Sequence, residues 1–345
     1  MTVNWSGVKK VLVVKLRSIG DTVLSTPSLI ALRRFLPEAQ IDILLEDWVA
    51  PVLKGSDLAV NVIPVGKSFG NRISIATKLF SANYDVAFNL HGGPTSTLFV
   101  LASGATERIG YSHYQYKFLY TQILSSSSDF WKREDTHSVE QQLALLGHVG
   151  VPVSDLPATT LGIEQTALQS INSKLENVGD FALLHPAAAF ETKQWDVGKF
   201  VRVAEFLYER GIRTVATVAK KERAILDELI TSSKIPIIGF DDLTLPEVTA
   251  LASRSKIFVG NDSGIAHIAA AVGVPPVVIF GSSNVSHWRP WGPGGRPNGE
   301  VVRETFPCQP CPGYTCGEYG DSRCITTVSA DSVISAINRI LTATA

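Results

Sequence analysis

Two successive runs of short apolar segments, separated by segments with helical spacing, form the hydrophobic pattern of the chain. In the first run, the segments that suit buried strands are residues 11–14, 41–45, 60–63, 84–89 and 107–111. Helical spacing of apolar residues follows at residues 24–35, 73–80 and 138–146. Strands that alternate with helices form βαβ crossovers, so the first half predicts a parallel sheet.

The same alternation restarts in the second half. Predicted strands fall at residues 181–184, 214–218, 235–238, 257–260 and 277–280, and predicted helices at 165–177, 197–209, 221–230 and 328–341. Thr244 and Glu247 have the spacing of a capping box, which predicts the start of one further helix that reaches residue 252. The second half therefore predicts another parallel sheet of similar size.

Residues 151–157 are predicted to link the two halves. The expected architecture is an α/β protein with two tandem Rossmann-like domains, residues 1–157 and 158–345. Open sheets of this kind bind ligands at the carboxyl ends of their strands, which predicts a site in a cleft between two facing sheets. Residues 112–134 lack a regular pattern and are expected to form a long surface loop or an extra element near that site.

A polar turn at residues 261–264 separates a predicted strand from an alanine-rich helix. It carries Asp262, Ser263 and Gly264 where the helix begins. Glycine allows close approach of a ligand, and the free N–H groups of a first helical turn attract anions, so the turn suits a phosphate. Asp262 and Ser263 are equally ordinary helix-capping residues. His267, one turn later, is either a packed histidine or a functional one.

The composition narrows the class of protein. The 345 residues are 45% hydrophobic and 18% charged, which indicates a folded enzyme of two domains rather than a disordered chain. A net charge of −1 gives no general reason to expect nucleic acid. The N-terminus lacks the long apolar segment of a signal peptide, and no apolar run approaches membrane-spanning length, so a cytoplasmic location is expected, with peripheral membrane contact open.

Three segments together resemble the ADP-heptose:lipopolysaccharide heptosyltransferases, which are glycosyltransferase family 9. They are residues 13–27, residues 260–267, and the Phe-Gly at 280–281 followed by Trp-Arg-Pro-Trp-Gly at 288–292. The resemblance implies the GT-B fold, with an acceptor-binding N-terminal domain and a nucleotide-sugar-binding C-terminal domain. It also implies inverting transfer of heptose from ADP-heptose to a lipopolysaccharide inner-core acceptor, with no metal or other cofactor required.

The resemblance assigns the two catalytic candidates. Asp21 matches the family's general base, which takes the proton of the acceptor hydroxyl. The alternative is that Asp21 only caps the helix that follows it. Lys193 matches the family lysine that meets the diphosphate of the donor, where a compact positive charge suits the leaving group. The alternative for Lys193 is a solvated lysine on a loop.

The donor-binding candidates lie in the second half. Glu222 matches the family glutamate that hydrogen-bonds the ribose, although a glutamate in a first helical turn is also favoured by the helix dipole. The remaining matches are Asp262, Ser263, Gly264 and His267. Sugar hydroxyls or backbone N–H groups are expected to be the partners of Asp262, because a carboxylate would repel phosphate.

The acceptor side is expected to be basic, because an inner-core saccharide carries carboxylates and phosphates. Arg17 is the leading candidate, and Lys15 and His91 are weaker ones. Each could equally be a surface charge. The adjacent glycines at positions 92 and 93 either permit close approach of the acceptor or simply form a tight turn. The acceptor implied by the resemblance is a lipid-linked saccharide at the inner membrane surface.

All four cysteines of the chain gather in one segment, residues 308–324. Cys308, Cys311, Cys316 and Cys324 have the spacing C-x₂-C-x₄-C-x₇-C. Such thiolates could hold structural zinc or, less readily, an iron–sulfur cluster. They could form two disulfides, or remain free thiols in a reducing compartment. None of these states makes the cysteines catalytic.

Other functions on a similar fold stay open as alternatives. A glycosyltransferase that uses another nucleotide sugar, a sugar-nucleotide epimerase or hydrolase, and a non-catalytic sugar-nucleotide-binding protein would share the diphosphate site. A dehydrogenase that uses NAD is disfavoured, because residues 16–20 read Leu-Arg-Ser-Ile-Gly and lack the G-x-G-x-x-G turn.

Overall fold

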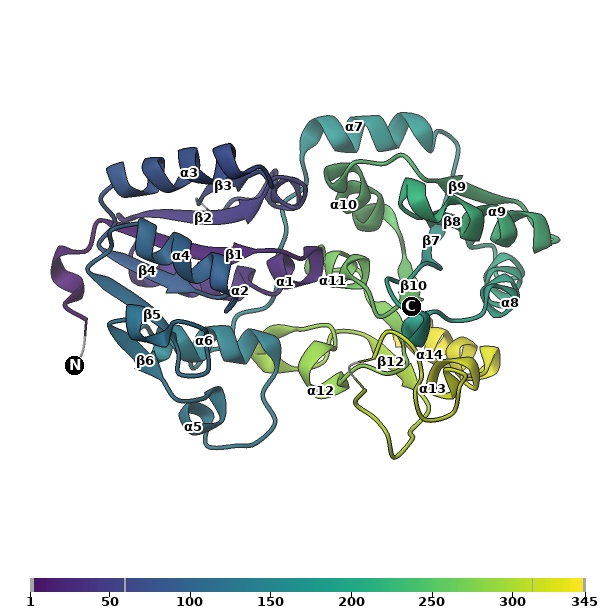
Figure 1. Ribbon diagram of the computed structural model, residues 1–345. Coiled ribbons are helices and arrows are strands. Elements are labelled where there is room, and N and C mark those ends of the chain that lie inside the picture. Colours follow the sequence, from purple (N-terminus) through teal and green to yellow (C-terminus); the bar gives the residue numbers. More distant parts are fainter. Residues whose placement is uncertain (1–2, 59, 312, 344–345) are drawn as a thin grey trace. The chain divides into compact units, whose positions relative to one another are not determined.

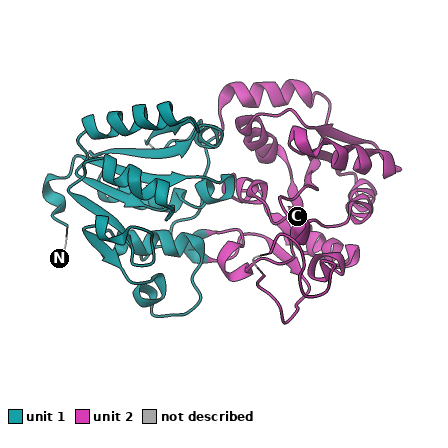
Figure 2. Cartoon of the chain, in the orientation of Figure 1, with its two compact units in different colours: residues 1–162, 293–295 teal, residues 163–292, 296–345 magenta. Residues whose placement is uncertain are grey.

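The computed structural model describes residues 3–58, 60–311 and 313–343. They divide into two compact units (Figure 2). Unit 1 comprises residues 1–162 and 293–295, and unit 2 comprises residues 163–292 and 296–345. The predicted boundary after residue 157 lies within unit 1. Hydrogen bonds on both sides of that boundary join the chain to unit 1. Leu156 O accepts one from Gly294 N (3.1 Å), and Thr160 N donates one to Thr26 Oγ1 (3.0 Å).

Unit 1 contains a parallel six-stranded sheet in the order β3-β2-β1-β4-β5-β6 (Figure 1). Its strands are β1 (Lys10–Leu16), β2 (Gln40–Glu46), β3 (Asn61–Val65), β4 (Val86–Asn89), β5 (Glu107–Tyr111) and β6 (Gln122–Leu124). Its helices are α1 (Ile19–Val23), α2 (Thr26–Phe35), α3 (Phe69–Ser81), α4 (Pro94–Ala102), α5 (Ser127–Trp131) and α6 (Ser138–His148). The parallel α/β sheet predicted for this half is confirmed.

Alternate residues of the central strand β1 serve the two faces of this sheet. Leu12 and Val14 pack into a core with Ile75 and Leu79 of α3 and Phe99 of α4. Neighbouring residues of a strand point to opposite faces, so Val11, Val13 and Lys15 share the other face. The helices α2 and α6 pack against each other, and α6 contacts β5. The unit therefore has the layers that parallel sheets require.

Unit 2 repeats this arrangement with the order β12-β11-β10-β7-β8-β9. Its strands are β7 (Phe181–His185), β8 (Arg213–Thr217), β9 (Ile237–Phe240), β10 (Ile257–Asn261), β11 (Pro276–Phe280) and β12 (Glu300–Arg303). Numbered from the start of each unit, both sheets read 3-2-1-4-5-6, the Rossmann order. Its helices are α7 (Gln165–Lys174), α8 (Val197–Tyr208), α9 (Arg223–Ser232), α10 (Leu245–Arg254), α11 (Gly264–Ala271), α12 (Val285–Trp288), α13 (Arg323–Thr326) and α14 (Ala330–Ala343).

One strand in each unit is absent from the sequence prediction. Of the two alternatives for residues 112–134, the extra element is what the structure shows, because the segment contains β6 and the short helix α5. Strand β12 was also missed. Both are edge strands, and neither has the continuous apolar run of the central strands. The capping box of α10 is confirmed, since Glu247 N donates to Thr244 Oγ1 and Thr244 N donates to Glu247 Oε2.

Candidate active site

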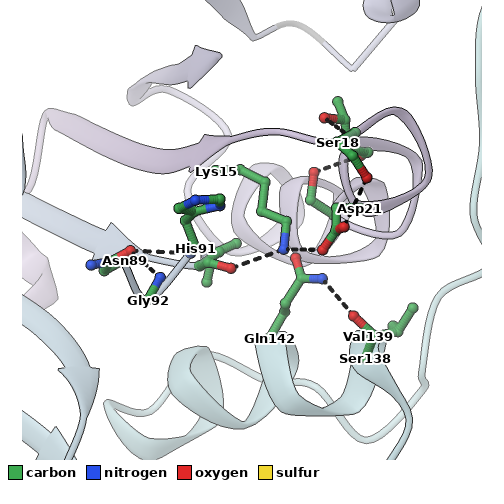
Figure 3. A network of polar contacts seen from close by, with 12 residues as sticks. Lys15, Ser18, Asp21, Asn89, His91, Gly92, Ser138, Val139 and Gln142 are labelled. Atoms are coloured by element: carbon green, nitrogen blue, oxygen red, sulfur yellow. Dashed lines mark hydrogen bonds and ion pairs between the residues drawn. The ribbon is translucent and has the colours of Figure 1, made fainter. Parts of the chain in front are cut away.

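In unit 1, Lys15 and Asp21 form an ion pair at the carboxyl end of β1. Lys15 Nζ lies 2.8 Å from Asp21 Oδ1, and Ser18 Oγ donates to Asp21 Oδ2 at 3.0 Å (Figure 3). Lys15 Nζ also donates to the carbonyl oxygen of Leu90, directly after β4, at 3.0 Å. The side chain of Asp21 is 27% exposed, whereas that of Lys15 is 6% exposed. A substrate can therefore reach the carboxylate but not the ammonium group.

The surroundings of Asp21 keep it ionised. Burial by itself would raise its pKa, but the charge and hydrogen bond of Lys15 and the hydrogen bond of Ser18 outweigh burial, so the pKa lies below the ordinary value of 3.8. Asp21 is a carboxylate at neutral pH and can accept a proton. It lies in the first turn of α1, yet its oxygens are bound by side chains, so the capping alternative is not what the structure shows.

Lys15 is not placed to bind an acceptor. It is buried, and its ammonium group is already bound to Leu90 O and to Asp21. The prediction of Lys15 as an acceptor-binding residue is therefore revised. Its geometry is that of a positioning residue, which fixes the carboxylate and holds its pKa down.

Replacement of Lys15 by methionine should move the acid limb of the turnover profile to higher pH. The pKa of Asp21 would rise, because burial would then act without the opposing charge of Lys15. The measurement is kcat/KM as a function of pH, alongside Lys10→Gln as a control at the opposite end of the same strand, where Lys10 Nζ binds Ala82 O. If the acid limb of the profile lay at the same pH in both variants, Lys15 would not be a positioning residue for Asp21.

His91 lies beside this pair on the turn after β4. Burial lowers its pKa, as do the charges of Lys15 and Arg17, and Asp21 only partly opposes them, so the imidazole is neutral at neutral pH. Arg17, directly after β1, is exposed. Of the three predicted acceptor-binding residues, Arg17 and His91 thus remain accessible for that role, and His91 would act through hydrogen bonds rather than charge.

Gly92, the residue after His91, is required by the fold. Gly92 has φ +86°, and a Cβ atom there would lie 2.5 Å from the ring of Tyr114. Asn89 Oδ1 accepts hydrogen bonds from the backbone N–H groups of His91 (3.0 Å) and Gly92 (2.9 Å), which closes the turn. The tight-turn alternative therefore accounts for Gly92.

Gln142 of α6 was not predicted from the sequence. Its amide Nε2 donates to Ser138 Oγ at 3.5 Å, and its buried Oε1 has no hydrogen-bond partner within the described residues. Figure 3 shows the Gln142 amide pointing toward the Lys15–Asp21 pair. Because this oxygen is shielded from solvent, Gln142 belongs to the buried surroundings of the pair rather than to the surface that a substrate reaches. A glutamine within an amphipathic helix gives no sequence signal for such a role.

In unit 2, the turn that carries Lys193 is fixed against the ends of β10 and β11. A Cβ atom at position 281 would lie only 2.2 Å from Thr192 O, so only glycine permits this close approach. Ser282 N donates to Thr192 O at 3.2 Å. Asn261 at the end of β10 accepts from Trp195 N at 3.2 Å. Lys193 is therefore held on an ordered turn rather than on a free loop.

Lys193 and Asp262 form the second ion pair, with Nζ 2.7 Å from Oδ2. Ser283 Oγ donates to the same carboxylate oxygen at 2.5 Å. These side-chain contacts, rather than helix capping, are what the structure shows for Asp262, and its expected bonds to sugar hydroxyls stay a prediction. Ser283 was missed, because a serine after a strand is common and its partner lies on another segment.

The remaining residues of the turn lie at the start of α11. Ser263 occupies the N-cap position without a capping hydrogen bond, and its Oγ is shielded and unbonded within the described chain. Gly264 is the first residue of α11, and His267 is buried one turn later. The first N–H groups of α11 thus emerge beside Asp262 without a side-chain cap, as an anion site requires.

Glu222 lies after β8 and is bound to the backbone. Its Oε2 accepts a hydrogen bond from Ala219 N at 3.0 Å. It is close enough to His185 to oppose the lowering of that histidine's pKa, which burial dominates. His185 Nδ1 lies 2.7 Å from Thr217 O. The structure thus supports the helix-start alternative for Glu222, and its ribose-binding role stays a prediction.

The two ion pairs occupy equivalent places in their sheets. Lys15 reaches from β1 to the residue after β4, and Lys193 follows β7 and reaches the residue after β10. β1 pairs with β4, and β7 pairs with β10. Each pair therefore lies at the carboxyl ends of the strands where the strand order reverses, which is where ligands bind in open α/β sheets.

The four cysteines are free thiols, so the disulfide alternative is not what the structure shows. Burial raises the pKa of the Cys324 thiol, and the other three thiols raise it further. Within the described residues, no group of three or more His, Cys, Asp or Glu side chains is arranged to hold a metal ion. The segment braces the Lys193 turn instead, since Cys311 N donates to Ser282 O (2.9 Å) and Thr192 Oγ1 donates to Gly313 O (3.1 Å).

No helix in the described ranges combines the length and apolar character needed to cross a membrane.

Comparison with known proteins relates the chain to heptosyltransferases. Residues 72–320 match glycosyltransferase family 9 (heptosyltransferase). Lipopolysaccharide heptosyltransferase 3 of Escherichia coli is 28% identical over 301 residues, which cover 80% of this chain and 84% of that protein.

Two solved structures share the fold. A family 9 glycosyltransferase from Veillonella parvula has a TM-score of 0.83 at 21% identity, over 99% of this chain and 98% of the other. The E. coli heptosyltransferase WaaC bound to ADP-2-deoxy-2-fluoro heptose has a TM-score of 0.70 at 19% identity, over 96% of this chain and 99% of the other. The predicted GT-B type of fold, with two Rossmann-like units, is thereby confirmed.

Proposed function

The chain belongs to glycosyltransferase family 9, the heptosyltransferases, and we propose that it transfers heptose from ADP-heptose to a lipopolysaccharide inner-core acceptor with inversion at the anomeric carbon. The observation that carries the chemistry is the ionised, partly exposed Asp21, which Lys15 and Ser18 hold at the carboxyl end of β1. The relatives named as heptosyltransferases supply the substrate class.

In this proposal, Asp21 takes the proton of the acceptor hydroxyl as its oxygen attacks the anomeric carbon. The new carbon–oxygen bond forms on the face opposite the bond to ADP, and ADP leaves with the electron pair of the broken bond. Arg17 and His91 bind the acidic saccharide. General-base catalysis of this kind contributes about 10²–10⁴ in rate.

On the donor side, Lys193 exchanges its partner. In the absence of donor it is neutralised by Asp262. We assign its function with donor to the diphosphate, whose charge grows as ADP leaves. The first N–H groups of α11, with Ser263 and Gly264, bind a phosphate. The buried His267 supports this turn from within α11. Asp262 then accepts hydrogen bonds from the sugar, and Glu222 accepts one from the ribose.

No metal is required in this mechanism, because Lys193 and the α11 N–H groups supply the positive charge that a metal would otherwise supply. The cysteine segment is assigned no catalytic step and no metal, since the thiols as they lie do not form a metal-binding group. The acceptor is lipid-linked, so we place the enzyme at the inner surface of the cytoplasmic membrane while it works.

The test is selective stabilisation by nucleotides, followed by transfer. ADP should raise the melting temperature and bind in calorimetry, whereas UDP, GDP and NAD should do neither. Transfer from ADP-heptose to the isolated inner-core saccharide is then measured in the presence of EDTA. Selective binding of UDP or GDP would retain the glycosyltransferase but reject heptose as the sugar, and a strict loss of turnover with EDTA would reject the metal-free mechanism.

A further inference from the structure

The outer surface of unit 1 carries apolar side chains on two adjacent helices. The helix α4 has no charged residue, and Leu98 and Leu101 on its solvent side are 54% and 41% exposed. Phe99 and Val100, on its other side, fill the core. No charged side chain of α4 accompanies these leucines in solvent, so they indicate a surface that contacts something apolar.

The neighbouring helix α3 continues this surface. Phe69 is 80% exposed, Ile73 is 50% exposed and Phe80 is 67% exposed. Their spacing of four and seven residues places them along one side of the helix. Helices α3 and α4 pack against each other, and the Phe80 ring lies over Gly104 just after α4, where a Cβ atom would be 3.4 Å from it. These five side chains form what we call the α3–α4 surface.

Basic side chains predominate around this surface, with the exposed Asp47, whose Oδ2 would lie 3.4 Å from a Cβ atom at Gly66, as an acidic neighbour. Lys67, Arg72 and Lys78 lie on or beside α3. Between Asp57 and Glu107 the sequence has a single acidic residue, Asp85, whose carboxylate binds the backbone N–H groups of Lys9 and Lys10. Exposed aromatic and aliphatic residues with flanking Lys and Arg are the composition of helices that lie in the interface of an anionic membrane.

We propose that the α3–α4 surface docks on the anionic phospholipid surface of the membrane that carries the acceptor. The identity of the membrane as the one that carries the acceptor rests on the proposed function, whereas the affinity for anionic lipid rests on the exposed side chains alone. A second copy of the chain fits less well, because a twofold contact through this surface would bring Lys67, Arg72 and Lys78 toward their own counterparts.

The topology makes this surface useful to the reaction. Helices α3 and α4 follow β3 and β4, so both begin at the carboxyl edge of the sheet, where Asp21 and His91 lie. Phe69 is the first residue of α3, with Ser68 as its N-cap. Docking through α3 and α4 therefore brings the acceptor-binding edge of unit 1 close to lipid head groups.

The test is co-sedimentation of the full chain with vesicles, one set of phosphatidylcholine alone and one of equimolar phosphatidylcholine and phosphatidylglycerol. We expect binding to the anionic vesicles that weakens with salt. The double variant Phe69→Ser, Phe80→Ser should weaken it about tenfold, and Lys67→Gln, Lys78→Gln should weaken it by a similar factor. The matched control is Tyr208→Ser, Ile230→Ser, two residues of unit 2 that are 45% and 36% exposed.

Three results would overturn the proposal. They are no binding to anionic vesicles, equal losses in the control and the α3–α4 variants, and a concentration-dependent dimer in gel filtration that the phenylalanine variant dissociates. Transfer to a deacylated, water-soluble acceptor separates this test from that of the function. The phenylalanine variant should keep full activity with that acceptor and lose it with acceptor embedded in anionic vesicles. Inactivity of the unaltered protein with both acceptors would reject the proposed function instead.

Discussion

Asp21→Asn should reduce transfer by about 10²–10⁴-fold and leave ADP binding nearly unchanged. Asparagine keeps the size of the side chain and its contact with Ser18, but it cannot take a proton from the acceptor. The measurement is kcat with saturating donor and acceptor, together with calorimetric binding of ADP. Asp155→Asn is the matched control, because that carboxylate is 53% exposed and pairs with Arg34 at the surface.

The same substitution leaves the buried Lys15 without its partner, so a lower melting temperature is also expected. Stability and catalysis must therefore be measured separately, at a temperature where the variant is folded. A large loss of ADP affinity in folded Asp21→Asn would contradict the assignment, since the residue would then belong to the donor site. If Asp21→Asn were about as active as Asp155→Asn, the role of Asp21 would be structural rather than catalytic.

Lys193→Gln should impair the enzyme in a different way, with a higher KM for the donor and kcat lower by about 10²-fold or more. The lysine meets the diphosphate in the bound state and again as charge develops on the leaving ADP, so both parameters depend on it. ADP affinity should fall as well. Lys256→Gln serves as the control, because that lysine is 49% exposed and pairs only with Asp180 among the contacts described.

The ion pair with Asp262 provides a second check on this lysine. Asp262→Asn releases Lys193 from its partner, so ADP should bind at least as tightly as before, while transfer of the sugar should slow. If Lys193→Gln left both KM and kcat unchanged, the lysine would be only an ordered surface charge. The Lys193–Asp262 pair would then have a structural role alone.

Much of the fold followed from hydrophobic spacing, because strands buried on both faces leave a strong signal. Val11–Val14 and Val277–Phe280 are examples, and both lie in central strands. The strands β6 and β12 left no such signal, since an edge strand is only half enclosed and can be short and polar. The start of α3 was predicted four residues late, because its first exposed turn, with Phe69, lies outside the amphipathic pattern.

The candidate site was predictable where one short motif contains it. The positions of Asp21 and Asp262 follow from the segments that resemble the family. Their partners were not predictable, because these come from sequence-distant strands and turns that only the fold brings together. Lys15 was assigned to the acceptor since a charged residue is expected at the surface, whereas the structure buries it between β1 and the end of β4. Ser283 and Gln142 are common residue types whose value depends on position alone.

The repeated strand order has a consequence for the chemistry of the two units. Each unit carries the same six-stranded Rossmann sheet with one lysine–aspartate pair at the same point of its topology. In unit 1 the aspartate is the accessible partner, and in unit 2 the lysine is three times as exposed as its aspartate, with 22% against 7%. The same strand order therefore presents a base at the switch point of one sheet and a cation at the switch point of the other.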